Sequence, residues 1–242
     1  MKNTQKINLL AFAAHPDDVE LAASGTMLKH KALGYSTGIV DLTRGELGTR
    51  GSAELRDLEA ADSAKILNLD VRENLAFADG FFEIDEQHLL EIIKRIRFYQ
   101  PDLMLVNAVS DRHPDHGRGS ELVSRAAFLA GLRKIKTNFK GIEQTPWRPK
   151  AVYHYIQYQE LKPDILVDIS EHIDQKMESI LAFKSQFFDP SSNEPETPIS
   201  SKQFIETVKN RSSELGKYIG VAHAEGFTVE RYVGTNNLFD LL

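Results

Sequence analysis

The sequence contains no cysteine. Disulfide bonds are therefore excluded, and so are thiolate metal ligands, so any metal ion must be held by histidine and carboxylate side chains. The chain also lacks an apolar run near the ~20 residues that a membrane span requires. Residues 1–6 are polar, with no apolar segment of a signal peptide behind them. These absences predict a cytoplasmic protein without a membrane partner.

The chain has no excess of basic residues either. The 242 residues carry a net charge of −6, which argues against a large nucleic-acid-binding surface. Hydrophobic residues make up 41% of the chain and charged residues 26%, as in ordinary globular proteins. The length suffices for one large α/β domain, and no repeat, low-complexity tract or clear linker interrupts it. We therefore expect a single domain over residues 1–242.

Short apolar segments alternate with amphipathic ones along most of the chain. This alternation predicts an α/β fold with a mostly parallel sheet and right-handed crossovers. In such sheets, functional residues gather at the carboxyl ends of the strands. Strands are expected at 7–13, 37–42, 74–78, 101–108, 151–156, 165–169 and 226–232, and helices at 19–33, 52–67, 85–99, 116–130, 171–183 and 203–218.

Two of these strands end in histidine and aspartate. Residues 15–18 read His-Pro-Asp-Asp, and residues 113–116 read His-Pro-Asp-His. A catalytic zinc site usually has three protein ligands and one open position for water. His15, Asp18 and His116 can supply such a set. Asp17 is then the expected acceptor of the water proton.

The remaining residues of the second motif also suit a catalytic site. His113 can stabilise a developing oxyanion or protonate a leaving group. The Asp115 carboxylate can fix the orientation of the His113 ring and stabilise its positive charge. Alternatives remain open: the aspartates can be simple helix caps, and His-Pro-Asp-His can form a turn. Their joint occurrence at two strand ends favours a metal-dependent hydrolase, although an esterase, a phosphoesterase or a non-catalytic sugar-binding module stays possible.

Several arginines lie near these strand ends. Arg44 and Arg50 belong to a glycine-rich segment at 43–51, and Arg112 and Arg118 flank the second motif. We expect Arg50 to contact substrate. For Arg56, the residue pattern favours a solvated charge or an ion pair with a neighbouring acid. The pattern assigns no role to two further histidines, His154 and His223.

The motifs Ala-His-Pro-Asp-Asp-Val-Glu (residues 14–20) and His-Pro-Asp-His resemble those of the PIG-L/LmbE family of zinc-dependent N-acetylglucosamine deacetylases. Within the family, the chain most resembles the deacetylases of bacillithiol biosynthesis. The similarity covers nearly the whole chain. The further stretches that carry it are 40–51, 74–82, 111–119, 147–157, 183–187 and 225–231.

This resemblance implies a Rossmann-like α/β fold of three layers, with the active site at the carboxyl ends of the strands. It also implies Zn²⁺ on His15, Asp18 and His116, with Fe²⁺ also possible because two imidazoles and a carboxylate suit that ion. The implied reaction is removal of the acetyl group from N-acetylglucosaminyl-malate; another N-acetylglucosamine conjugate or a chito-oligosaccharide is the alternative. Related proteins form trimers or hexamers, which makes a homo-oligomer the expected assembly.

The resemblance also assigns individual site residues. Asp17 becomes the general base, and His113, supported by Asp115, lies beside the scissile amide. The resemblance also places Arg56 near the sugar hydroxyls, whereas the residue pattern alone favours a solvated charge or an ion pair for this residue. Family members often carry an aromatic residue two positions before His113, where this chain has Asp111.

Overall fold

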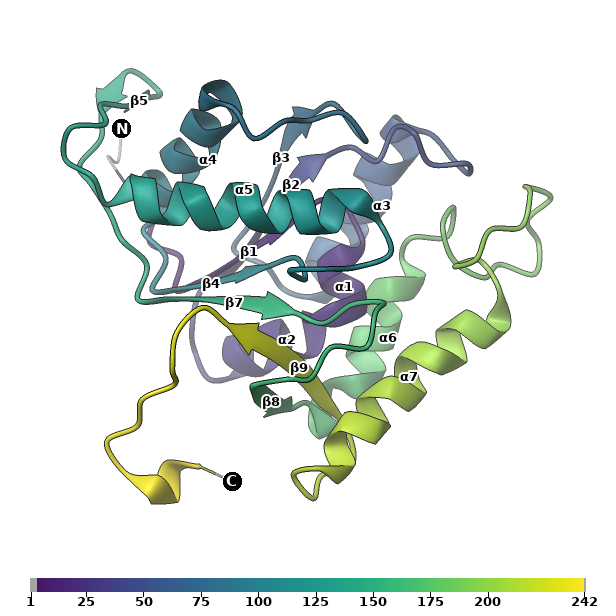
Figure 1. The fold of residues 1–242 in the computed structure, drawn as a ribbon. Coiled ribbons are helices and arrows are strands. Elements are labelled where there is room, and N and C mark those ends of the chain that lie inside the picture. Colours follow the sequence, from purple (N-terminus) through teal and green to yellow (C-terminus); the bar gives the residue numbers. More distant parts are fainter. Residues whose placement is uncertain (1–3, 242) are drawn as a thin grey trace.

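The computed structural model describes residues 4–241 and has a twisted sheet of seven strands between two layers of helices (Figure 1). From β3 to β7, neighbouring strands run parallel, whereas β9 is antiparallel to both β7 and β8. The predicted α/β three-layer fold is thus confirmed. The strand order is β3 (Val71–Phe77), β2 (Thr37–Thr43), β1 (Leu9–Ala13), β4 (Leu103–Val106), β7 (Ala151–Tyr155), β9 (Ala224–Val229) and β8 (Ile165–Asp168).

The helices lie on both faces of this sheet. On one face are α4 (Glu86–Tyr99) and α5 (Pro114–Ala130), and the remaining helices lie on the other (Figure 1). Between α5 and β7, where no helix or strand is predicted, the chain contains the short hairpin β5 (Asn138–Phe139) and β6 (Ile142–Glu143). The other helices are α1 (Asp18–Ala22), α2 (Ser24–Ala32), α3 (Ala53–Ile66), α6 (Ile173–Leu181) and α7 (Lys202–Lys217), with short 3₁₀ turns at Ser170–His172 and Leu238–Asp240.

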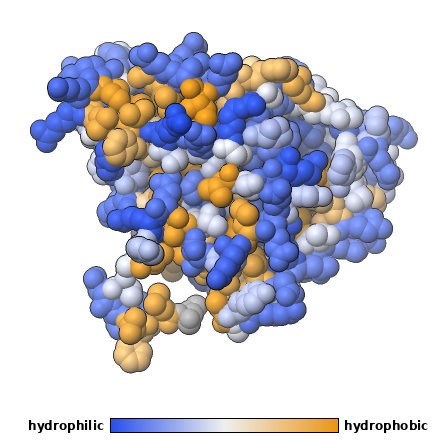
Figure 2. Space-filling view, in the orientation of Figure 1, coloured by the Kyte–Doolittle hydropathy of each residue, from blue (hydrophilic) through white to orange (hydrophobic). Residues whose placement is uncertain are grey.

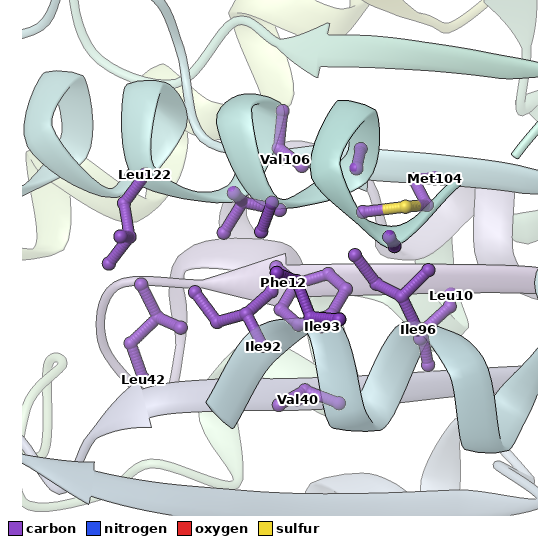
Figure 3. Close-up of a cluster of buried hydrophobic side chains, with 14 of the residues drawn as sticks. Leu10, Phe12, Val40, Leu42, Ile92, Ile93, Ile96, Met104, Val106 and Leu122 are labelled. Atoms are coloured by element: carbon purple, nitrogen blue, oxygen red, sulfur yellow. The ribbon is translucent and has the colours of Figure 1, made fainter. Parts of the chain in front are cut away.

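Strand β1 is buried along its whole length. Leu10 and Phe12 pack on the face covered by α4 and α5 (Figure 3), whereas Leu9 and Ala11 pack on the opposite face. Because successive side chains of a strand point to opposite faces, a strand covered on both sides must be apolar throughout. This explains why β1 is an apolar run without polar alternation.

The chain changes direction across the sheet at β1. Strands β2 and β3 extend from one side of β1, and after α4 the chain returns to place β4 on its other side. In open α/β sheets, this switch point leaves a crevice at the carboxyl ends of the two central strands. The His-Pro-Asp-Asp motif follows β1, and the His-Pro-Asp-His motif follows β4.

Helix α5 begins earlier than the expected range of 116–130. It starts at Pro114, with His113 as the N-cap residue. Proline is favoured at the first helical position because its missing N–H group has no helical partner there. His116 consequently lies in the first turn of the helix, which faces the crevice.

The prediction of a single helix at 19–33 is wrong. The structure has two helices that meet at Ala23, whose φ is −141°. The backbone groups at this point bind a buried ion pair instead of each other. Lys176 Nζ donates to the carbonyl oxygens of residues 20 and 21, and the Glu225 carboxylate accepts from the N–H groups of residues 25 and 26. Both side chains come from distant parts of the chain, so no local pattern could reveal the break.

Beyond β9 the chain leaves the body of the protein (Figure 1). This last segment carries exposed apolar side chains, among them Tyr232, Leu238 and Phe239. Figure 2 shows an apolar group of atoms at the same place. Of the helices between residues 4 and 241, none has both the length and the apolar composition needed to cross a membrane.

Candidate functional site

The two motifs meet at the carboxylate of Asp18. Its Oδ2 atom accepts hydrogen bonds from the backbone N–H of His15, at 2.9 Å, and from Asn107 Nδ2, at 3.0 Å. Its Oδ1 atom accepts from Gln157 Nε2 at 2.6 Å. Two imidazole nitrogens face the same carboxylate: His15 Nδ1 is 3.6 Å from Oδ2, and His116 Nε2 is 3.1 Å from Oδ1. The three predicted metal ligands are therefore neighbours.

The other nitrogen of each imidazole is held by a carboxylate. His15 Nε2 lies 3.0 Å from Asp79 Oδ1 and 3.4 Å from Asp115 Oδ2. His116 Nδ1 lies 2.7 Å from Asp111 Oδ2. In protein metal centres, a carboxylate commonly holds the ring nitrogen that does not bind the ion, and so fixes the orientation of the ring. Both imidazoles have this arrangement here.

The electrostatics of this cluster favour a positive charge at its centre. Burial alone would raise the pKa of Asp18, yet the adjacent His116 and His15 hold it well below its ordinary value. Burial alone would lower the pKa of His116, but Asp18 and Asp111 raise it to about 9. A site that attracts protons onto its imidazoles in this way also attracts a divalent cation, which competes with those protons. The donor set of two imidazoles and one carboxylate fits such an ion.

Ligand atoms converge in two compact groups among the described residues. One contains His15, His113 and His116, and the other contains His15, Asp79 and Asp115; within each group the atoms lie within 4.8 Å of one another. The first group shares two members with the predicted ligand set. It differs from that set in containing His113 in place of Asp18.

The His113 side chain is oriented by the helix that it caps. Its Nδ1 atom accepts a hydrogen bond from the backbone N–H of Asp115, at 3.3 Å. The proton of the neutral ring must then sit on Nε2. Burial lowers the pKa of His113, as do the nearby rings of His15 and His116, so the neutral form is favoured. His113 can therefore offer an N–H donor to a ligand in the cavity.

In the structure, the Asp115 carboxylate does not hold the His113 ring as predicted. The backbone of Asp115, not its carboxylate, bonds to His113. The carboxylate instead faces His15 Nε2 and accepts from the backbone N–H of Gly80 and from Arg118. The first turn of α5 directs this side chain toward the loop after β3, which brings it behind His15.

Asp17 has a backbone conformation that is rare for any residue except glycine. Its φ is 123° and its ψ is −20°. Such outliers cost free energy and are found most often at functional sites. The side chain is buried, lines the cavity and makes no capping hydrogen bond to α1. Burial raises the pKa of Asp17 to about 7, against the opposing effect of the Arg56 guanidinium.

Arg56 extends from α3 beneath the glycine-rich segment. A Cβ atom added at Gly45 would lie 2.0 Å from Nη1 of Arg56, and one added at Gly48 would lie 2.9 Å from Nη2. Glycine is thus required where the loop covers the guanidinium. Arg56 is 6% exposed and lines the cavity near Asp17. The expectation of a solvated surface charge is wrong.

The expected contact between Arg50 and substrate is not supported. The Arg50 side chain turns away from the cavity because residues 187–194 supply its partners: the Phe187 carbonyl, the Ser192 hydroxyl at 2.6 Å and the Glu194 carboxylate at 3.8 Å. Two other arginines near the strand ends are also paired. Arg44 binds Glu54 and Asp57, and Arg118 binds Asp115.

A cavity of about 770 Å³ lies at the carboxyl ends of β1 and β4, and its lining includes His15, Asp17, Asp18, Arg56, His113 and His116. The sequence interpretation assigned no role to Asp79, Asp111, Asn107 or Gln157, although each orients a predicted ligand. A weak signal exists for two of them, because Asp79 and Gln157 directly follow predicted strands. Asn107 lies inside the predicted strand 101–108 and follows only the shorter β4 that the structure shows. His154 and His223 are not among the residues that line the cavity. His154 bonds to Ser120, Glu230 and the Asn107 carbonyl oxygen, and His223 bonds to Ser212.

Three known proteins illustrate the similarities of this chain. Diacetylchitobiose deacetylase of Thermococcus kodakarensis is 29% identical over 189 residues, which are 74% of this chain and 70% of that protein. The crystal structure of the conserved protein TT1542 from Thermus thermophilus has a TM-score of 0.84 and 37% identity, covering 95% of this chain and 97% of the other. N,N'-diacetylchitobiose deacetylase from Pyrococcus horikoshii has the same fold, with a TM-score of 0.76, 24% identity and coverage of 92% and 83%.

The chain also matches a model of a protein family. The model of PIG-L, described as GlcNAc-PI de-N-acetylase, matches residues 10–127. This range contains β1, β4 and both motifs of the site. Residues 10–127 of this chain, just under half of its 242 residues, therefore match the PIG-L family.

Proposed function

We propose that this protein is a metal-dependent N-deacetylase that hydrolyses the N-acetyl group of an N-acetylglucosamine conjugate. One observation carries the proposal: two imidazoles, each held from behind by a carboxylate, face Asp18 beside the buried carboxylate of Asp17. A metal centre with an adjacent proton acceptor is what hydrolysis of an amide needs.

In this proposal His15, Asp18 and His116 bind one Zn²⁺ ion, and Fe²⁺ suits the same donors. The orientation of the rings supports this choice, because His15 Nδ1 and His116 Nε2 point to Asp18 while their other nitrogens are occupied. His113 is a poorer ligand. Its Nδ1 already accepts a backbone hydrogen bond, which leaves the protonated Nε2 toward the cavity.

The chemistry that a divalent ion supplies when bound here is Lewis acidity, which polarises an amide carbonyl and makes water more acidic. Asp17 accepts the proton of the attacking water and can return it to the departing amine. His113 donates its Nε2–H to the oxygen that becomes negative in the transition state. Arg56 lies near Asp17 and can bind the sugar hydroxyls as it lines the same cavity.

For the substrate, we propose N-acetylglucosaminyl-malate, the substrate implied by the resemblance in the motifs. The alternative is a chito-oligosaccharide, because two similar proteins are diacetylchitobiose deacetylases. The test is acetate release by the purified protein, loaded with Zn²⁺ or Fe²⁺, from N-acetylglucosaminyl-malate, diacetylchitobiose and N-acetylglucosamine. A clearly higher kcat/KM for the malate conjugate supports this substrate. Higher efficiency on diacetylchitobiose transfers the assignment to the alternative, and no release from any of them contradicts the proposed function.

Two substitutions separate the ligand assignments. His116→Ala should lose most of the bound metal, whereas His113→Ala should retain it and lose activity, because His113 acts on the transition state. Metal content by elemental analysis, with circular dichroism to verify folding, decides between them. Loss of metal in His113→Ala with retention in Asp18→Asn would favour the three-histidine group instead.

A further inference from the structure

The cavity continues beyond the candidate metal centre. Its far wall is formed by the segment before α7 and by α7 itself, including Ile199, Phe204 and Val208. The loop after β7 closes the side between α7 and the start of α5. Two arginines, Arg112 and Arg211, line this outer part of the cavity.

Both arginines contact Tyr158 in the loop after β7. Arg211 Nη2 donates to the Tyr158 carbonyl oxygen at 2.7 Å. The guanidinium of Arg112 lies 4.9 Å from the centre of the Tyr158 ring. Arg112 directly precedes His113, and Arg112, His113 and Arg211 line the same cavity.

Neither guanidinium forms an ion pair within residues 4–241. The nearest acids to Arg211 are Asp111 and Glu160, but the Asp111 oxygens are already bonded to His116 and to the backbone N–H groups of residues 158 and 159. Burial lowers the pKa of Arg211, as expected where no close acid compensates the charge. Of the other arginines described above, those at positions 44, 50 and 118 have acidic partners, and Arg56 lies near Asp17.

We propose that Arg112 and Arg211 form an anion-binding subsite, which takes a carboxylate or phosphate group carried by the part of the substrate beyond the N-acetyl sugar. This inference rests on the proposed function. The guanidinium group is suited to the role because it grips a carboxylate or phosphate through two parallel hydrogen bonds. In a chain of net charge −6, two unpaired positive charges at the cavity also provide the local attraction that an anion needs.

The subsite predicts a selective loss of activity. Arg112→Gln and Arg211→Gln should each lower kcat/KM for N-acetylglucosaminyl-malate by about 10- to 100-fold, the scale of a hydrogen bond to a charged group. Their kcat/KM for neutral diacetylchitobiose should change less than about twofold. Arg211→Lys should recover part of the loss, because it keeps the charge but not the planar fork. Arg125→Gln, at an exposed residue of α5 paired with Glu121, is the matched control and should change neither.

N-acetylglucosamine 1-phosphate separates the two anion classes: a larger arginine effect on this substrate identifies phosphate as the natural group, and a larger effect on the malate conjugate identifies carboxylate. Equal losses on anionic and neutral substrates, or no loss on either, would overturn the subsite. Calorimetry with malate alone keeps the test independent of catalysis. If the wild-type protein releases no acetate but binds malate more tightly than both Gln variants, the subsite stands while the proposed function fails; equal malate affinity in all three overturns the subsite.

Discussion

Asp111 Oδ2 lies 2.7 Å from Nδ1 of His116. Asp111 stands where members of the family that the two motifs resemble often carry an aromatic residue. Its other oxygen accepts the backbone N–H of Gln159 at 2.8 Å. The same carboxylate thus orients an imidazole of the candidate metal centre and ties the loop after β7 to the start of α5. An aromatic ring, that of Tyr158, still lies beside this point, but it comes from the loop.

Removal of the Asp111 carboxylate should therefore weaken metal binding. In Asp111→Asn, His116 keeps at most a neutral amide oxygen as its partner and loses the carboxylate charge that strengthens its Nε2 atom as a metal ligand. We expect metal affinity to fall by about 10- to 100-fold, measured by competition with a chelator of known affinity. Asp62→Asn, at an exposed acid of α3 paired with Lys65, is the control. Unchanged affinity in Asp111→Asn would show that this hydrogen bond does not support the ligand.

The break between α1 and α2 gives a prediction about stability. Lys176 and Glu225 form a buried ion pair at 2.7 Å, and both also bind backbone groups at the break. Lys176→Met should leave a buried carboxylate without its cation, at a cost of about 3–5 kcal/mol in the free energy of unfolding. Urea denaturation measures this loss. Lys217→Met, which removes an exposed pair with Glu214, should cost far less, because exposed ion pairs contribute little to stability. Equal losses in the two variants would contradict the argument.

The elements of the fold were predictable where a local pattern determines them. Helix α4 is an example: Asp85 caps its first turn, and Ile92, Ile93 and Ile96 recur at the spacing that faces the sheet. The two motifs were predictable for a similar reason, since each directly follows a buried strand. Parallel neighbouring strands then bring His15 and His116 to the same edge of the sheet.

The remaining features depend on contacts between distant segments. Gln157 reaches Asp18 only because β7 pairs with β4, and Arg211 reaches the cavity only because α7 packs beside β9. Asp115 has the residue type and spacing of a partner for His113, yet the direction of the first helical turn sends its carboxylate to His15. Residue patterns give the identity of such side chains but not their direction.

Asp102 gives a prediction about pH. Hydrogen bonds from Lys6, at 2.9 Å, and from Asn8, at 3.0 Å, lower the pKa of Asp102 from 3.8 to about 2. A carboxylate with a lowered pKa in the folded state stabilises the protein above its unfolded pKa, and this contribution disappears as the pH falls through the folded pKa. Wild-type protein should therefore lose more stability between pH 4 and pH 2 than Asp102→Asn does. Urea unfolding at several pH values measures the difference, and Lys6→Gln should reduce it. Parallel curves for wild type and Asp102→Asn would contradict the assignment.

The backbone of Asp17 predicts a conflict between stability and activity. A residue with a side chain at φ 123° and ψ −20° is strained by about 1–3 kcal/mol, whereas glycine adopts this conformation without strain. Glycine loses more backbone entropy on folding, which costs roughly 0.5–1 kcal/mol. Asp17→Gly should still be the more stable protein, by about 1–2 kcal/mol, because it also removes a buried carboxylate.

Asp17→Asn separates the two effects. It retains the strained backbone and the size of the side chain, so its stability should lie between those of the wild type and Asp17→Gly. Both variants lack the proton acceptor and should lose about 10²-fold or more in kcat while they keep their metal. For a chain of this length, a gain of 1 kcal/mol raises the melting temperature by about 2–4 °C, which calorimetry on the metal-free proteins resolves. A lower melting temperature for Asp17→Gly than for wild type would show that the conformation at Asp17 is not strained. Full turnover in Asp17→Asn would instead show that the strain does not serve to position a general base.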